Sequence, residues 1–158
     1  FSCGQLSDLA IKAHECSRRI VSELSQMGRP GVEAKALYER AIAIAQEEGL
    51  DPYFMGHKQK AGFVGHGVGI EINELPVLAP RSRDILAIGN AIAIEPKFVI
   101  PGVGAVGVEN TYIVTENGMI SITNAPEEII KGANRQVEST IRTIKESQAE
   151  KVKVKTNG

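Results

Sequence analysis

Residues 91–118 read AIAIEPKFVIPGVGAVGVENTYIVTENG, and this stretch decides the fold class. Two runs in it, residues 91–100 and 105–115, are rich in Val and Ile and alternate in the manner of strands, where β-branched side chains pack well. Asn117-Gly118 follows the second run and readily adopts the positive φ angles of a tight turn, so this run is predicted to form a hairpin with residues 119–122. We therefore expect a β-sheet at the centre of the chain.

Each of the two runs contains a single acidic residue. Glu95 lies among small and apolar residues, and strand alternation would direct its carboxylate to the side of Ala91 and Ala93. Glu109 repeats this situation in the second run. An unpaired carboxylate on a buried strand is costly, and metal coordination is one way to offset that cost. For either strand taken alone, a backbone or lysine partner is the simpler explanation.

Upstream of these runs, His66 lies in the glycine-rich segment GHGVG, residues 65–69. The flanking glycines would let other groups approach the imidazole closely. A single histidine in such a segment is more often structural than a metal ligand. Together with Glu95 and Glu109 on neighbouring sheet segments, however, it makes a set of one imidazole and two hard oxygen ligands, which suits Mn, Fe, Co or Zn.

Two amphipathic helices are predicted before the sheet. Apolar residues recur every three or four positions over residues 6–27, with Ser7 as the N-terminal cap and Gly28 as the end. A second helical pattern follows a Pro-Gly pair and covers residues 32–48, and residues 50–62 are predicted to form a loop. Helices followed by strands indicate an α+β fold.

The composition indicates a soluble globular protein. The 158 residues are 42% hydrophobic and 23% charged, and the formal net charge of −1 gives no field that would favour nucleic acid or an anionic membrane. The two cysteines, Cys3 and Cys16, have neither metal-binding nor secreted spacing, so a reducing cytoplasm is expected. No segment has the pattern of a transmembrane span or a signal peptide.

The ends of the chain carry further expectations. Residues 133–158 repeat apolar residues at helical spacing in a polar background, which predicts a C-terminal helical tail with a solvated basic end; an arm that contacts a partner subunit is the alternative. Residues 1–4 lack an initiator Met and lead almost directly into a helix, as expected of a cut inside a larger chain. With no internal repeat or linker, residues 1–132 are predicted to form one domain.

Four short segments resemble the successive signatures of the pita-bread peptidases, which include Xaa-Pro aminopeptidases, prolidases and methionine aminopeptidases. These are GHGVGIE (65–71), IEP (94–96), VENT (108–111) and VTENG (114–118). The longer stretches IEPKFVIPG and GVENTYIVTENG are more similar to the Xaa-Pro branch. The resemblance implies that residues 1–132 are part of a pita-bread catalytic domain, an α+β fold with an antiparallel or mixed sheet and helices packed on one face.

The resemblance also implies roles for the three candidate ligands. His66 and Glu95 would bind divalent metal and act in catalysis, Glu95 as a proton shuttle, while Glu109 would bridge two ions (Mn, Co, Fe or Zn). The other ligands of the family are two aspartates on strands that precede the first helix. The sequence contains only Asp8, Asp51 and Asp84, none of them in such a strand, so the chain is expected to be a fragment with little or no activity.

The sequence departs from the pattern of the Xaa-Pro branch at four positions. Asn73 replaces a histidine that helps bind substrate, and Gly62 replaces a second histidine, for which His57 is a candidate substitute. Gly107 stands where this branch often has arginine. Lys97 replaces the glycine after Glu-Pro and is expected to point to solvent, with a substrate carboxylate as the alternative partner. Asn73 and His57 are therefore the candidate substrate-binding residues.

The function that follows is metal-dependent hydrolysis of Xaa-Pro peptide bonds in proline-containing peptides, by a cytoplasmic, homodimeric aminopeptidase or dipeptidase that binds neither nucleic acid nor membranes. One alternative is a non-catalytic pita-bread module that binds peptides or proteins. Another is a metal-free amidinohydrolase of the creatinase type. This last function normally needs the histidine that is replaced here by Asn73.

Overall fold

The computed structural model describes residues 2 and 4–131, which fall into two compact units. The main unit is Ser7–Glu127. The other consists of Phe1–Leu6 and Glu128–Gly158, and in its described part the backbone N–H of Ser2 donates a 2.9 Å hydrogen bond to the carbonyl of Ile130. The helical tail predicted for residues 133–158 lies outside the described residues. Within those residues, no helix has the length and apolar character needed to cross a membrane.

The two predicted helices are present as α1 (Asp8–Met27) and α2 (Ala34–Glu47). Ser7 caps α1 as predicted, because its Oγ accepts a 3.2 Å hydrogen bond from the backbone N–H of Ala10. Gly28 ends α1, but with a φ of −70° that any residue can adopt. A Cβ at this position would meet the end of the Met119 side chain, which would have to shift.

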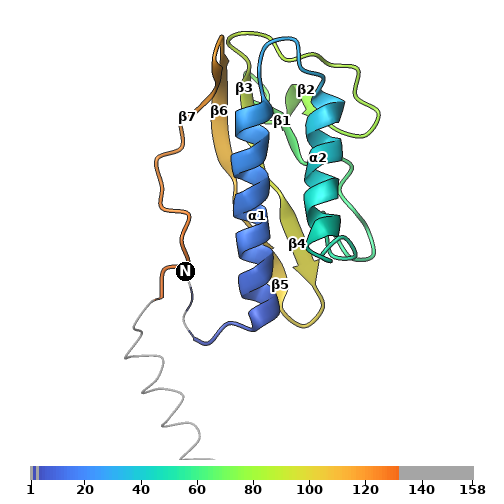
Figure 1. The fold of residues 1–158 in the computed structure, drawn as a ribbon, viewed down its shortest axis with the longest axis vertical. Coiled ribbons are helices and arrows are strands. Elements are labelled where there is room, and N and C mark those ends of the chain that lie inside the picture. Colours follow the sequence, from blue (N-terminus) through green and yellow to red (C-terminus); the bar gives the residue numbers. More distant parts are fainter. Residues whose placement is uncertain (1, 3, 132–158) are drawn as a thin grey trace, which may run out of the picture. The chain divides into compact units, whose positions relative to one another are not determined.

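The strands form two sheets (Figure 1). The larger sheet has five strands in the order β2-β1-β3-β6-β7, and the smaller pairs β4 with β5. Every pairing between these strands is antiparallel, and the predicted hairpin around Asn117-Gly118 is confirmed as β6–β7. The bounds are β1 Gly65–Gly67, β2 Glu74–Leu78, β3 Ala91–Ile94, β4 Lys97–Ile100, β5 Gly104–Gly107, β6 Asn110–Thr115 and β7 Gly118–Ser121.

The two long strands predicted for residues 91–100 and 105–115 are each broken in the middle. The first becomes β3 and β4 with Glu95-Pro96 between them, and the second becomes β5 and β6 with Val108-Glu109 between them. Pro96 has no backbone N–H and cannot donate a ladder hydrogen bond, which explains the position of the break. The prediction that both glutamates lie inside strands is therefore wrong.

The helices cover one face of the larger sheet (Figure 1). Ile92 of β3 lies opposite Tyr112 of β6, and both side chains are buried on the helical side of the sheet. Because side chains alternate along a strand, Ala93 and Thr111 point to the other face, which neither helix covers. The predicted α+β architecture with helices on one face is confirmed in this part of the chain.

A network of ion pairs joins the outer surfaces of α1 and α2. Arg19 binds Glu23 at 2.8 Å and also pairs with Glu47, while Arg40 binds Glu23 at 2.6 Å and Glu47 at 2.8 Å. Burial by itself raises the pKa of Glu23, but hydrogen bonds from Arg40 and Arg19 outweigh it and hold that pKa below its ordinary value. The same two arginines lower the pKa of Glu47.

This network predicts a loss of stability in acid. Because the pKa values of Glu23 and Glu47 are lower in the folded chain than the ordinary 4.5, their contribution is complete above pH 4.5 and disappears as the pH falls through the folded values. Arg40→Met should make the free energy of unfolding less dependent on pH in this range, as measured by urea denaturation at several pH values between 6 and 3.

The matched control is Lys35→Met, which removes a pair with Glu39 on α2 that lies outside the network. This control should keep the pH dependence of the unchanged chain. An equal pH dependence in Arg40→Met and in the unchanged chain would contradict the assignment of the pKa shifts to the network.

Candidate metal centre

His66, Glu95 and Glu109 come from three neighbouring segments of the sheet and share one face. His66 on β1 lies opposite Ala93, and Glu95 follows Ala93 by two residues, with its backbone N–H bonded to the carbonyl of Val64 at 2.9 Å. Residues opposite each other in antiparallel strands, and residues two apart along a strand, point to the same side. The histidine and both glutamates are therefore on the face away from α1 and α2.

The hairpin brings the two glutamates to opposite positions. Ile94 pairs with Asn110 before the break and Lys97 pairs with Gly107 after it, so the register is the same on both sides. In this register, Glu95 lies directly opposite Glu109. The break therefore interrupts the hydrogen bonds of the ladder without shifting the two carboxylates relative to each other.

The glycines beside His66 allow close approach of the neighbouring strands, and not only of groups near the imidazole as predicted. A Cβ on Gly65 would collide with the carbonyl oxygen of Ala93, and a Cβ on Gly67 would collide with the carbonyl oxygen of Leu75. The glycines thus admit the neighbouring backbone on both sides of β1. They fix the strand that carries the imidazole, which is itself buried with 6% of its surface exposed.

The contacts of the His66 ring fix the role of one of its nitrogens. Nδ1 lies 3.0 Å from the carbonyl oxygen of Gly67, and a carbonyl can only accept, so Nδ1 is the donor. Nε2, the other ring nitrogen, faces Oε1 of Glu95 at 3.5 Å. With its proton on Nδ1 alone, the ring would offer a lone pair at Nε2, and a cation could then bind between Nε2 and Oε1.

Glu95 has a second partner at its other oxygen. Lys97 donates a 2.7 Å hydrogen bond to Oε2, and the side chain of Glu95 is only 16% exposed. The expectation that Lys97 points to solvent is therefore wrong, because both residues lie on the same side of the bend. The simpler explanation considered for this glutamate, a lysine partner, is present in the structure.

Glu109 lies across an open hollow from Glu95. The hollow has a volume of about 220 Å³ and is lined by Glu95, Pro96, Lys97, Ala105, Gly107, Val108 and Glu109. Glu109 itself is exposed, so its carboxylate does not carry the burial cost that the sequence suggested. Within the described residues, no group of three or more His, Cys, Asp or Glu side chains is close enough to hold a metal ion. The structure thus brings together His66 and Glu95, with Glu109 opposite but apart.

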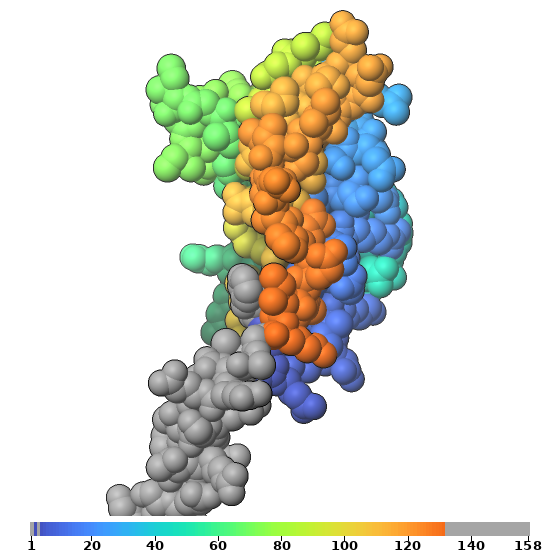
Figure 2. Space-filling view, turned by 90° about the vertical axis from the view of Figure 1, so that its left-hand side faces the viewer, coloured from blue at the N-terminus to red at the C-terminus, as the bar shows by residue number. Residues whose placement is uncertain are grey.

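The two candidate substrate-binding residues lie in exposed loops. Asn73 belongs to the segment between β1 and β2, where Ile70 and Ile72 are also exposed, and Figure 2 shows this green segment standing out from the body of the chain. His57 lies in the predicted loop after α2. In the described part of the chain, neither residue forms a hydrogen bond to His66.

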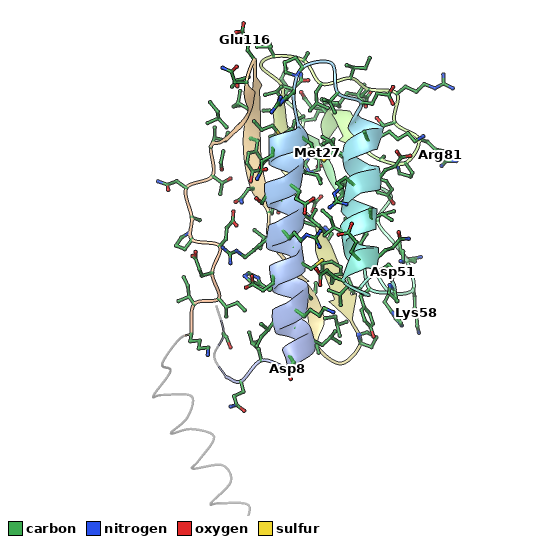
Figure 3. The ribbon with its side chains drawn as sticks, in the orientation of Figure 1. Asp8, Met27, Asp51, Lys58, Arg81 and Glu116 are labelled. Carbon is green, nitrogen blue, oxygen red and sulfur yellow. The ribbon has the colours of Figure 1, made fainter. Side chains whose placement is uncertain are left out.

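The three aspartates are used elsewhere. Asp8 begins α1 and Asp51 follows α2, and Figure 3 shows both at the lower ends of the helices. Asp84 accepts hydrogen bonds of 2.9 Å each from the backbone N–H of Val77 and the hydroxyl of Ser82. The carboxylate of Asp84 therefore already has two partners.

Two residues of this region have a role that the sequence did not reveal. Gly107 lies against the bend, where a side chain would collide with the carbonyl oxygen of Pro96. Lys97 binds one of the candidate ligands. Neither role has a local signal in the sequence, because both depend on the bend at Glu95-Pro96.

The donor set fits a divalent metal ion. An imidazole lone pair and carboxylate oxygens are suitable ligands for Mn, Fe, Co or Zn. Bonds from such ions to nitrogen and oxygen are each about 2 Å long, so one ion can reach two atoms that are 3.5 Å apart. The hydrogen bond from Nδ1 to a backbone carbonyl is also the usual way in which a metal-binding histidine is oriented.

A model of metallopeptidase family M24 matches residues 1–116. The chain belongs to this family. The uncharacterized peptidase YqhT of Bacillus subtilis is 41% identical over 103 residues, which are 65% of this chain and 27% of that protein. The Xaa-Pro dipeptidase of Pyrococcus furiosus is 37% identical over 105 residues, 66% of this chain and 28% of that protein. The solved Xaa-Pro dipeptidase from Bacillus anthracis superimposes with a TM-score of 0.74 and 30% identity, covering 84% of this chain and 36% of that one.

These matches confirm the predicted family and fold. The M24 chain is an α+β part of the pita-bread fold, and its relatives include Xaa-Pro dipeptidases. The matched segment spans 27% and 28% of the length of these two curated relatives.

The close packing around His66 gives a prediction for Gly67. Gly67→Ala should lower the free energy of unfolding by about 1–3 kcal/mol, the usual result of overpacking, because the new methyl group has to displace the backbone at Leu75. Gly62→Ala is the matched control, since its Cβ would meet open space and should change stability by no more than about 0.5 kcal/mol. Chemical denaturation measures both, and equal stabilities of the two variants would contradict the packing described for β1.

Proposed function

We propose that the protein to which this chain belongs is a metal-dependent peptidase that hydrolyses Xaa-Pro peptide bonds, as an aminopeptidase or a dipeptidase. The observation that carries the proposal is Nε2 of His66 facing the Glu95 carboxylate at 3.5 Å on the sheet of an M24 chain. The Xaa-Pro dipeptidases among its relatives support the substrate class.

The proposed ligands are His66, Glu95 and Glu109, with Glu109 bridging two divalent ions. When bound, such ions would lower the pKa of a shared water and polarise the scissile carbonyl. His66 presents Nε2 because Nδ1 is held by the carbonyl of Gly67. Glu95 accepts a proton from the attacking water and delivers it to the proline nitrogen that leaves. Asn73 and His57 are proposed to contact the peptide substrate.

The 158-residue chain by itself is proposed to be inactive or nearly so. His66, Glu95 and Glu109 are three ligands, and within the described residues they do not form a closed group. Metal affinity falls steeply when ligands are missing. We propose that two aspartates from another part of the full-length protein complete the site.

We also propose a cellular location, an oligomeric state and a metal ion for the enzyme. The net charge of −1 and the spacing of the cysteines favour a cytoplasmic protein that binds neither nucleic acid nor membranes. We propose a homodimer, with residues 1–132 as part of the catalytic domain and residues 133–158 as a helical tail. Manganese is the first ion to test, because carboxylate ligands suit it.

A second candidate function is a non-catalytic module that binds peptides or proteins. The observation in its favour is that Glu95 is neutralised by Lys97 while Glu109 is exposed. A module of this kind would need no metal. The retained arrangement of His66 toward Glu95 favours the peptidase.

The test compares two glutamates of the full-length protein. With Mn²⁺ present and Xaa-Pro dipeptides and tripeptides as substrates, Glu109→Gln should lower kcat/KM at least about 100-fold, because it removes the bridging ligand. Glu116→Gln should leave it unchanged, since Glu116 lies at the tip of the β6–β7 hairpin (Figure 3).

Chelation of the metal should also abolish cleavage, and added Mn²⁺ should restore it. Cleavage that persists after complete removal of metal, or no cleavage with any divalent ion, would contradict the peptidase. The second of these results together with tight peptide binding would support the binding module.

A further inference from the structure

The Glu95 carboxylate is shared between a potential metal site and an ammonium group. Oε1 faces Nε2 of His66 at 3.5 Å, and Oε2 accepts the 2.7 Å hydrogen bond from Lys97. Lys97 therefore already supplies a positive charge to this carboxylate. Because the side chain of Glu95 is only 16% exposed, this charge acts with less screening than it would in bulk water.

Lys97 is able to leave this position. Its side chain is 38% exposed, more than that of Glu95, and its four-carbon stem allows the ammonium group to move into solvent. His66 cannot do the same, since it is buried and held by Gly67. Glu95 can thus exchange one cation for another without any change in the strands that hold it.

A metal ion that binds Glu95 would compete with Lys97 for the same carboxylate. The ion would draw on the same negative charge, and it would place a second positive charge beside the ammonium group. Two like charges beside the same largely buried carboxylate repel each other. Binding therefore requires that the hydrogen bond from Lys97 is broken or weakened.

We propose that Lys97 competes with the metal ion for Glu95 and lowers the affinity of the site for divalent cations. The inference rests on the proposed metal site. In this role, Lys97 raises the concentration of free metal ion at which the site becomes occupied. The opposite role, in which Lys97 orients Glu95 for the metal, predicts an opposite result.

The experiment measures Mn²⁺ binding to the full-length protein at one fixed pH by calorimetry and by the electron paramagnetic resonance signal of free Mn²⁺. Lys97→Met keeps the length of the side chain without its charge, and Lys97→Gln is a second neutral variant. Both should lower the Kd for Mn²⁺ at least about tenfold, the ratio expected from one charge-assisted hydrogen bond. Lys97→Arg keeps the charge and should bind like the unchanged protein.

Lys60→Met is the control, because Lys60 bonds the carbonyl of Asp51 and lies outside the hollow. It should leave the Kd unchanged. If the unchanged protein binds Mn²⁺ and both neutral variants have the same or a higher Kd, the proposed role of Lys97 is wrong. The proposed metal site is not affected by that result. No Mn²⁺ binding by any of these proteins, all of them folded, would overturn the metal site and the proposed function together.

Discussion

The missing backbone N–H of Pro96 shapes the part of the molecule on which the proposed function depends. Pro96 ends the hydrogen bonding of β3, and the chain continues as β4 in a second sheet. The partner strand follows the same bend, because Gly107 lets the backbone of Pro96 approach. Since the register is the same before and after the bend, Glu95 and Glu109 face each other at the junction of the two sheets.

The rest of the fold gives this junction a fixed orientation. α1 and α2 pack on the side of Ile92 and Tyr112, and this packing leaves the candidate ligands on the opposite side. His66 reaches that side on β1, a strand that depends on close backbone contacts at its glycines. One face of the sheet therefore packs against the helices, and the other carries the candidate ligands.

The sequence was sufficient for the elements with strong local signals. The periodicity of residues 6–27, the cap at Ser7 and the turn at Asn117-Gly118 all depend on neighbouring residues, and the structure confirms them. The break at Glu95-Pro96 was missed, although a proline inside a strand pattern is a known signal for it. The partner of Lys97 was missed as well, because a charge next to a bend has no preferred side until the bend is known. The resemblance named the three candidate ligands, but their separation depends on pairing between distant segments, which no local pattern contains.

The most direct test of the account is a crystal structure of the full-length protein grown with Mn²⁺, with the metal located by anomalous scattering. We predict a manganese ion bonded to Nε2 of His66 and to the carboxylate of Glu95, with bonds of about 2 Å. Glu109 should bridge this ion to a second one. Manganese bound elsewhere in the domain, with the His66 ring and Glu95 still paired only to each other and to Lys97, would contradict the account.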